Sequence, residues 1–201
     1  MRRRNFLCGA AGMLGLGFTF AGRRQDNYFC GVRDIPNALR SKDKWGREHL
    51  RYCIAGRDND LPGEVWDEQF ELAFDAWADV TPLTFEQVSP DDTYDIYISV
   101  SRRRRECFGR PGGTLAWAQL PSTKNFDGVL ISKFDLAENW VLPELSEAGT
   151  VLLSVAAHEI GHLLGLDHSN DKDALMYPYI NNALNPREDD IKKIRRLYPI
   201  S

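Results

Sequence analysis

Three of the four histidines in this chain fall within eleven residues, and their spacing suits metal binding. His158 and His162 are four residues apart, so on a helix their imidazoles project from one face and can hold one ion. Gly165 lets the chain leave the helix in a conformation that other residues resist, and the following turn brings His168 round as a third ligand. Three imidazoles with one open position are typical of catalytic zinc, because structural zinc sites are usually closed by four protein ligands.

Glu159 directly follows the first of these histidines. A carboxylate at this position can reach a water on the metal instead of the metal itself, which suits a general base. A histidine-rich helix that binds no metal is the alternative interpretation. Glu159, Gly165 and His168 together argue against that alternative, because a helical pair of histidines alone needs none of them.

Hydrophobic spacing predicts the elements that position this cluster. Apolar residues spaced by threes and fours from Val65 to Val80 predict an amphipathic helix whose aromatic face packs in the core. Two more helices are expected at 149–166 and 186–198, the latter with Pro186 at its start. Strands are expected at 49–54, 84–88, 94–100, 114–120 and 129–133. Strands mixed with three helices predict an α+β domain with a twisted sheet.

The N-terminal segment predicts export. Residues 1–21 combine a basic start, an apolar stretch of roughly 15 residues and small residues at its end. Residues 3–7, Arg-Arg-Asn-Phe-Leu, resemble a twin-arginine signal, although an ordinary secretory signal or an uncleaved anchor remain alternatives. We therefore expect a secreted or extracytoplasmic protein with a short arm at 22–43 and one domain at 44–201.

Composition excludes several classes of function. With 201 residues, 43% hydrophobic and 27% charged, the chain fits one globular domain. The net charge of −4 argues against non-specific nucleic-acid binding, so the four arginines at 102–105 are interpreted as a solvated loop. We expect a monomer without a stable membrane span, because the one long apolar stretch is shorter than the about 20 residues that a bilayer requires.

The histidine segment resembles a known family. His-Glu-x-x-His-x-x-Gly-x-x-His is the metzincin signature, and Ser169 after it is typical of the matrixins, the matrix metalloproteinases and their relatives. Met176 lies in Ala-Leu-Met-Tyr-Pro, which resembles the matrixin Met-turn beneath the metal. Further similarity follows in order over residues 44–199, at Lys44-Trp45, Ala76-Trp77, Val80 to Phe85, Asp95-Ile96, Asp189 to Ile191 and Leu197-Tyr198. The resemblance implies a metzincin catalytic domain with a twisted five-stranded mixed sheet, three helices and a cleft.

The same resemblance implies a secreted zinc endopeptidase that acts on protein or peptide substrates. Glu159 would be the general base toward the attacking water and would then pass the proton to the leaving amine. Two alternatives stay open, a metzincin of narrow specificity outside the matrixins and a catalytically inert binding module stabilised by zinc. Glu159 argues against the inert module, which needs no base.

Substrate-binding positions follow from the resemblance. Leu115 and Ala116 match the edge strand whose main-chain groups hold an extended substrate. Ser154 matches a residue that helps to set the depth of the primary specificity pocket, and its small size should admit a large apolar side chain. Pro178 matches the outer wall of that pocket, whereas Ile180 replaces an expected aromatic residue.

The sequence departs from the family at its other metal sites. Only His49 remains outside the catalytic motif, and Trp117 replaces an expected histidine, so we expect no second, structural zinc. Asp135 and Glu138 match calcium ligands, but Gly109 replaces their partner aspartate, and we therefore do not expect calcium.

The cysteines suggest a disulfide and an inhibitory metal ligand. By resemblance, Cys53 and Cys107 lie on or beside neighbouring strands and are candidates for a disulfide, with two free buried thiols as the alternative. Cys30, in Cys-Gly-Val-Arg-Asp, resembles the matrixin cysteine switch, whose thiolate takes the fourth zinc position and keeps the enzyme latent. The flanking residues differ from the family and little chain precedes it, so an incidental or intermolecular cysteine is the alternative.

Overall fold

The computed structural model describes residues 30, 43–101, 108 and 112–200. The predicted export signal, nearly all of the arm, the four arginines, Cys107 and Gly109 lie outside these residues. Within the described ranges, no helix combines the length and apolar character needed to cross a bilayer.

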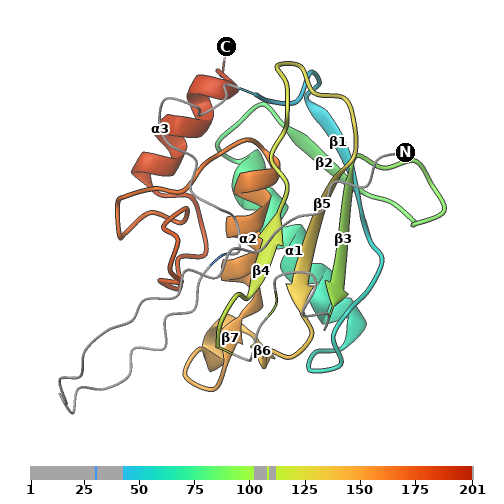
Figure 1. The fold of residues 1–201 in the computed structure, drawn as a ribbon, viewed down its shortest axis with the longest axis vertical. Coiled ribbons are helices and arrows are strands. Elements are labelled where there is room, and N and C mark those ends of the chain that lie inside the picture. The colour runs from blue at the N-terminus through green and yellow to red at the C-terminus, as the bar shows by residue number, and fades with distance from the viewer. Residues whose placement is uncertain (1–29, 31–42, 102–107, 109–111, 201) are drawn as a thin grey trace, which may run out of the picture.

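A five-stranded mixed sheet forms one layer of the domain, as the sequence predicts (Figure 1). The strand order is β2-β1-β3-β5-β4, with β4 antiparallel to β5 and the other pairs parallel. Because β4 is at one end of this order, one side of it is an open edge. The strands are β1 (His49–Ile54), β2 (Thr84–Gln87), β3 (Ile96–Ser101), β4 (Ala116–Ala118) and β5 (Leu130–Asp135).

Three helices complete the fold: α1 (Gly63–Ala78), α2 (Leu152–Leu163) and α3 (Glu188–Leu197). Helices α1 and α2 pack against each other, and α3 lies at the outer edge of the domain, away from the sheet (Figure 1). The aromatic face predicted for α1 is core packing, since Trp66, Phe70, Phe74 and Trp77 are each at most 1% exposed. The indole of Trp77 also donates to the carbonyl of Ala157 in α2 at 2.8 Å. This bond fixes α1 against the helix that carries two of the histidines.

The boundaries of two helices differ from the prediction. The helix expected at 149–166 begins at Leu152, because Thr150–Val151 form a short strand, β7, paired with β6 (Trp140–Val141). It ends at Leu163, just before Gly165 takes a φ of +103°. The helix expected at 186–198 begins at Glu188, because Arg187 is still extended with ψ at 179°. Pro186 therefore lies before the helix instead of in its first turn.

The C-terminal end of α2 is capped by side chains from both ends of the domain. The indole of Trp45 donates to the carbonyl of Leu163 at 2.8 Å, and the hydroxyl of Tyr198 donates to that of Leu164 at 3.0 Å. These carbonyls have no partner within the helix, so the two bonds satisfy groups that would otherwise be buried without one. The cap holds the helix end from which the chain turns toward His168.

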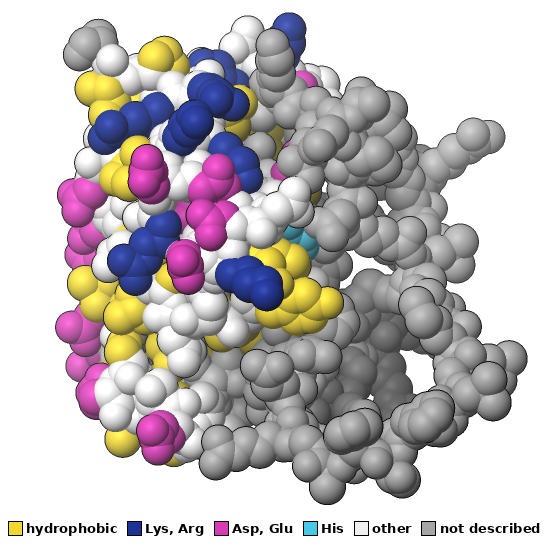
Figure 2. Space-filling model, turned by 90° about the vertical axis from the view of Figure 1, so that its left-hand side faces the viewer, with side chains coloured by type: hydrophobic (Ala, Val, Ile, Leu, Met, Phe, Trp, Pro, Cys, Tyr) yellow, Lys and Arg dark blue, Asp and Glu magenta, His cyan; other side chains and the backbone are white. Residues whose placement is uncertain are grey.

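The outer face of α3 is charged. Viewed from the α3 side, basic and acidic side chains are mixed on the surface, and a histidine side chain is visible beside a hydrophobic patch (Figure 2). The opposite side of α3 is buried, with Asp190 and Ile194 both 0% exposed. A buried aspartate on an otherwise apolar face needs hydrogen-bond partners, which backbone N–H groups of Leu175, Met176 and Arg187 supply.

Candidate metal centre

The structure brings the three histidines of the motif together. His158 and His162 project from α2, and the turn after Gly165 carries His168 toward them. Their ring centroids lie 4.8 to 5.4 Å apart, and none of the three residues is more than 6% exposed. With Cys30 they form a group whose four ligand atoms all lie within 4.8 Å of one another.

Backbone carbonyls orient two of these imidazoles. Nδ1 of His158 bonds to the carbonyl of Leu175, and Nδ1 of His162 bonds to that of Leu166, each at 2.7 Å. A carbonyl only accepts, so both Nδ1 atoms carry the proton and both Nε2 atoms offer a lone pair to the centre. Nε2 of His158 is buried without a hydrogen-bond partner among the described residues, as expected of an atom meant for a metal.

Burial also keeps the imidazoles neutral. It lowers the pKa of His158 to about 3, with the nearby His168 acting in the same direction. Burial lowers the pKa of His162 well below its ordinary value, and both neighbouring histidines add to the effect. Neutral imidazoles are the form that binds metal, and three imidazoles with a sulfur in the fourth direction fit tetrahedral zinc.

Glu159 is 1% exposed and lies on α2 next to His158. Burial raises the pKa of its carboxyl to about 8, while a hydrogen bond from the Cys30 thiol acts in the opposite direction. A dication in the histidine cluster would favour the ionised carboxylate. In that state, Glu159 is a base placed beside the metal position.

Met176 is 0% exposed and directly follows Leu175, whose carbonyl bonds to His158. It approaches α2 at Gly161, where an added Cβ would lie 2.3 Å from the Met176 sulfur. The same Cβ would lie 2.9 Å from Cζ2 of Trp77. Gly161 is therefore a functional position that the motif spacing alone did not single out, although a glycine inside a helix is an unusual residue that could have drawn notice.

Cys30 lies at the fourth position around the metal site. Its sulfur is 3.4 Å from Nε2 of His162, and the residue is only 5% exposed. Its backbone N–H donates to the carbonyl of Pro178 at 3.2 Å, so this part of the arm lies against the segment that was predicted to be a pocket wall.

The predicted substrate-binding residues lie on or next to β4, on α2 and after the Met-turn. The carbonyl of Leu115 accepts a hydrogen bond from the backbone N–H of Asp135 in β5 at 2.8 Å, so this carbonyl takes part in pairing within the sheet. Main-chain groups alternate in direction along an antiparallel strand, which turns those of Ala116 toward the open edge of β4. Ser154 lies on α2 and is 2% exposed, and Ile180 packs partly buried against the core.

Asn181 was not predicted from the sequence. Its side-chain amide donates to the carbonyls of Lys172 and Ala174, each at 2.8 Å, and its Oδ1 accepts from the N–H of Ala183 at 3.1 Å. These bonds tie the segment after Ile180 to the loop that leads into the Met-turn. An asparagine in a loop carries no periodic signal, so only the structure reveals this role.

The remaining predicted residues lie elsewhere. His49 is exposed on β1, where its ring contacts Thr84 and Glu86. Trp117 lies on β4, with the ammonium of Lys133 6.0 Å from its ring centroid. Asp135 and Glu138 are both buried, and Glu138 accepts a hydrogen bond from the N–H of Gly112 at 2.8 Å.

Cys53 lies on β1, is 0% exposed and forms no disulfide with another of the described residues. Burial raises the pKa of this thiol. Its predicted partner, Cys107, lies outside the described residues, so the disulfide stays a prediction.

The amino-acid sequence of this chain is similar to those of known proteins. A model of the matrixin family matches residues 44–199. Stromelysin-2 of Rattus norvegicus is 38% identical over 179 residues, covering 84% of this chain and 36% of the relative. Interstitial collagenase of Equus caballus is 38% identical over 176 residues, with the same coverage. Matrix metalloproteinase-C of Caenorhabditis elegans is 35% identical over 188 residues, covering 84% of this chain and 31% of the relative.

The chain therefore spans about a third of the length of these curated relatives. Within that third lie the sheet, the three helices and the buried histidine cluster described above. The family match covers more than half of this chain and agrees with the fold and the metal centre, so the chain belongs to the matrixin family of zinc metalloendopeptidases.

Proposed function

We propose that this chain hydrolyses internal peptide bonds of protein substrates. The convergence of three buried imidazoles beside the buried carboxyl group of Glu159 carries this proposal. His158, His162 and His168 would hold zinc, which supplies a Lewis acid for the scissile carbonyl and makes water more acidic.

The other residues of the site have separate roles in substrate binding and proton transfer. The open edge of β4 binds an extended substrate by main-chain pairing, with Ala116 at the centre of that edge. Glu159 takes the proton from the attacking water and then delivers it to the nitrogen of the leaving amine. Ser154, Pro178 and Ile180 shape the pocket for the side chain that follows the cleaved bond.

Digestion of casein tests this function. A variant lacking the Cys30 thiol should cleave casein, and the purified wild-type chain should cleave it much more slowly. A chelator should stop the cleavage until zinc is added back. Cleavage that is insensitive to the chelator would contradict a metal mechanism. Zinc binding without cleavage in either form would favour the inert binding module.

Cys30 is proposed to keep the enzyme latent. Its sulfur lies where the fourth ligand of a tetrahedral zinc belongs, so a thiolate there excludes the water that catalysis needs. The backbone N–H of Cys30 also donates to the carbonyl of Pro178, a predicted wall of the substrate pocket, which supports a blocking role. Cys30 would thus block the metal position and the pocket wall beside it.

Cys30→Ser is expected to raise the activity of the full-length chain toward a peptide substrate by about tenfold or more, because each ~1.4 kcal/mol of lost inhibitory binding is worth tenfold. Initial rates of wild type and variant at equal zinc content measure this effect. Cys53→Ala is the matched control, since it removes a buried thiol that belongs to β1 and not to the metal centre. Equal rates for wild type and Cys30→Ser would refute the switch.

Residues 1–21 are proposed as the export signal and residues 22–43 as the arm, which places the catalytic domain outside the cytoplasm. The N-terminal residue of the exported protein, compared with that of the full chain, locates the boundary between the signal and the arm.

A further inference from the structure

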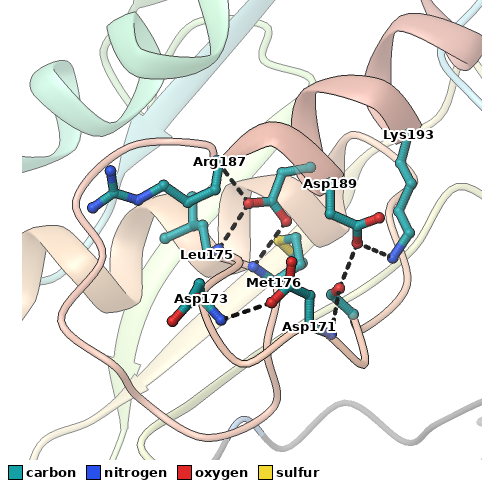
Figure 3. A network of polar contacts seen from close by, with 9 residues as sticks. Asp171, Asp173, Leu175, Met176, Arg187, Asp189 and Lys193 are labelled. Carbon is teal, nitrogen blue, oxygen red and sulfur yellow. Dashed lines mark hydrogen bonds and ion pairs between the residues drawn. The ribbon is translucent and has the colours of Figure 1, made fainter.

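A buried carboxylate outside the catalytic motif contacts the Met-turn. Asp190, in the first turn of α3, is 0% exposed. Its side chain accepts backbone N–H groups from Leu175 at 2.7 Å, Met176 at 3.1 Å and Arg187 at 2.8 Å. Figure 3 shows these three bonds converging on one carboxylate between α3 and the Met-turn. Three N–H donors stabilise its negative charge in a place that water does not reach.

One of these bonds leads to the metal centre. The N–H of Met176 and the carbonyl of Leu175 belong to the same peptide group. The N–H end of that group donates to Asp190, and the carbonyl end accepts from Nδ1 of His158 at 2.7 Å. A single peptide group therefore connects the carboxylate of Asp190 to the imidazole of a metal ligand.

Such a connection has electronic consequences. A negative charge at the N–H end of a peptide polarises it and makes its carbonyl a stronger acceptor, since hydrogen bonds in a chain strengthen one another. A stronger acceptor at Nδ1 fixes the tautomer of the imidazole and raises the basicity of Nε2. Metal-binding histidines commonly obtain this effect from a carboxylate bound directly to Nδ1, and here a peptide lies between the two groups.

We propose that Asp190 is a positioning residue of the metal centre, which tightens zinc binding by acting on His158 through the Leu175–Met176 peptide. This proposal rests on the zinc site of the proposed function. The neighbouring Asp189 provides a contrast, because its carboxylate accepts from the Ser169 hydroxyl and pairs with Lys193 at 2.6 Å (Figure 3). Of the two adjacent aspartates, only Asp190 bonds to the peptide that His158 uses.

Zinc affinity tests this role more directly than activity does. The full chain is stripped of zinc and reloaded in competition with a chromogenic chelator, as wild type, Asp190→Asn and Asp189→Asn. Asp190→Asn is expected to bind zinc about 10- to 100-fold more weakly, the usual effect of losing a partner behind a ligand. Asp189→Asn keeps an acceptor for Ser169 and is expected to match the wild type. In the cobalt-substituted protein, only Asp190→Asn should shift the visible absorption bands.

A purely structural role gives a different result. It would lower the unfolding temperature of zinc-free Asp190→Asn while leaving the chelator competition and cobalt spectrum unchanged, and this result overturns the proposal. If Asp190→Asn does not fold, Asp190→Glu replaces it, and its displaced carboxylate should give a zinc affinity below that of the wild type. Wild-type affinity in Asp190→Glu, with a less stable zinc-free fold, also overturns the proposal. A wild-type chain that binds no zinc would instead refute the proposed function.

Discussion

Glu159→Gln is expected to remove nearly all peptide hydrolysis while zinc stays bound. Glutamine keeps the shape of the side chain but cannot accept the proton of the attacking water. General base catalysis contributes about 10²- to 10⁴-fold to such reactions, so kcat should fall by this amount. The rate on a peptide substrate and the zinc content of the same sample, both measured in the Cys30→Ser background, test the prediction.

Glu138→Gln is the matched control for this experiment. Glu138 is also a buried glutamate, at 5% exposed, but its partner is the N–H of Gly112, which an amide oxygen can still bind. We expect near wild-type rates from it. Full activity of Glu159→Gln would refute the assignment of the base. Loss of zinc from that variant would instead make Glu159 a metal ligand.

Gly161→Ala is expected to destabilise the domain and to disturb the zinc site. The new Cβ would lie 2.3 Å from the sulfur of Met176 and 2.9 Å from the ring of Trp77, so one of these side chains must move. Overpacking of this kind costs about 1–3 kcal/mol. For a domain of this size, each kcal/mol lowers the melting temperature by about 2–4 °C. Thermal unfolding of the zinc-free and zinc-loaded protein measures the effect.

Two further variants identify the cause of the lower stability of Gly161→Ala. Gly63→Ala places a methyl group in another helix, where its nearest contact is the Arg57 side chain at 3.4 Å, and should leave stability nearly unchanged. Adding Met176→Ala to Gly161→Ala removes the closest contact. Met176→Ala should therefore lower the free energy of unfolding less in the Gly161→Ala background than in the wild type. Additive losses would show that Gly161 and Met176 do not depend on each other.

The sequence by itself determined the main helices and strands and the candidate histidine ligands, because both depend on local spacing. A period of three to four residues predicts α1 and its aromatic core face, and the structure confirms that packing. The spacing of His158 and His162 places both imidazoles on one face of any regular helix, whatever surrounds it. Gly165 likewise marks the end of α2, because its φ of +103° suits glycine best.

The tertiary structure decided what lies behind and around those ligands. The start of α2 is set by the pairing of Thr150–Val151 with Trp140–Val141, and no local pattern predicts that pairing. No local pattern predicts the hydrogen bonds of Asp190 to the Met-turn or the contact of the Met176 sulfur with Gly161 either. These contacts join segments 10 or more residues apart, and a contact of that kind exists only after the chain has folded and buried both partners. Local periodicity therefore predicts which residues can bind zinc, whereas packing between distant segments decides what orients those residues.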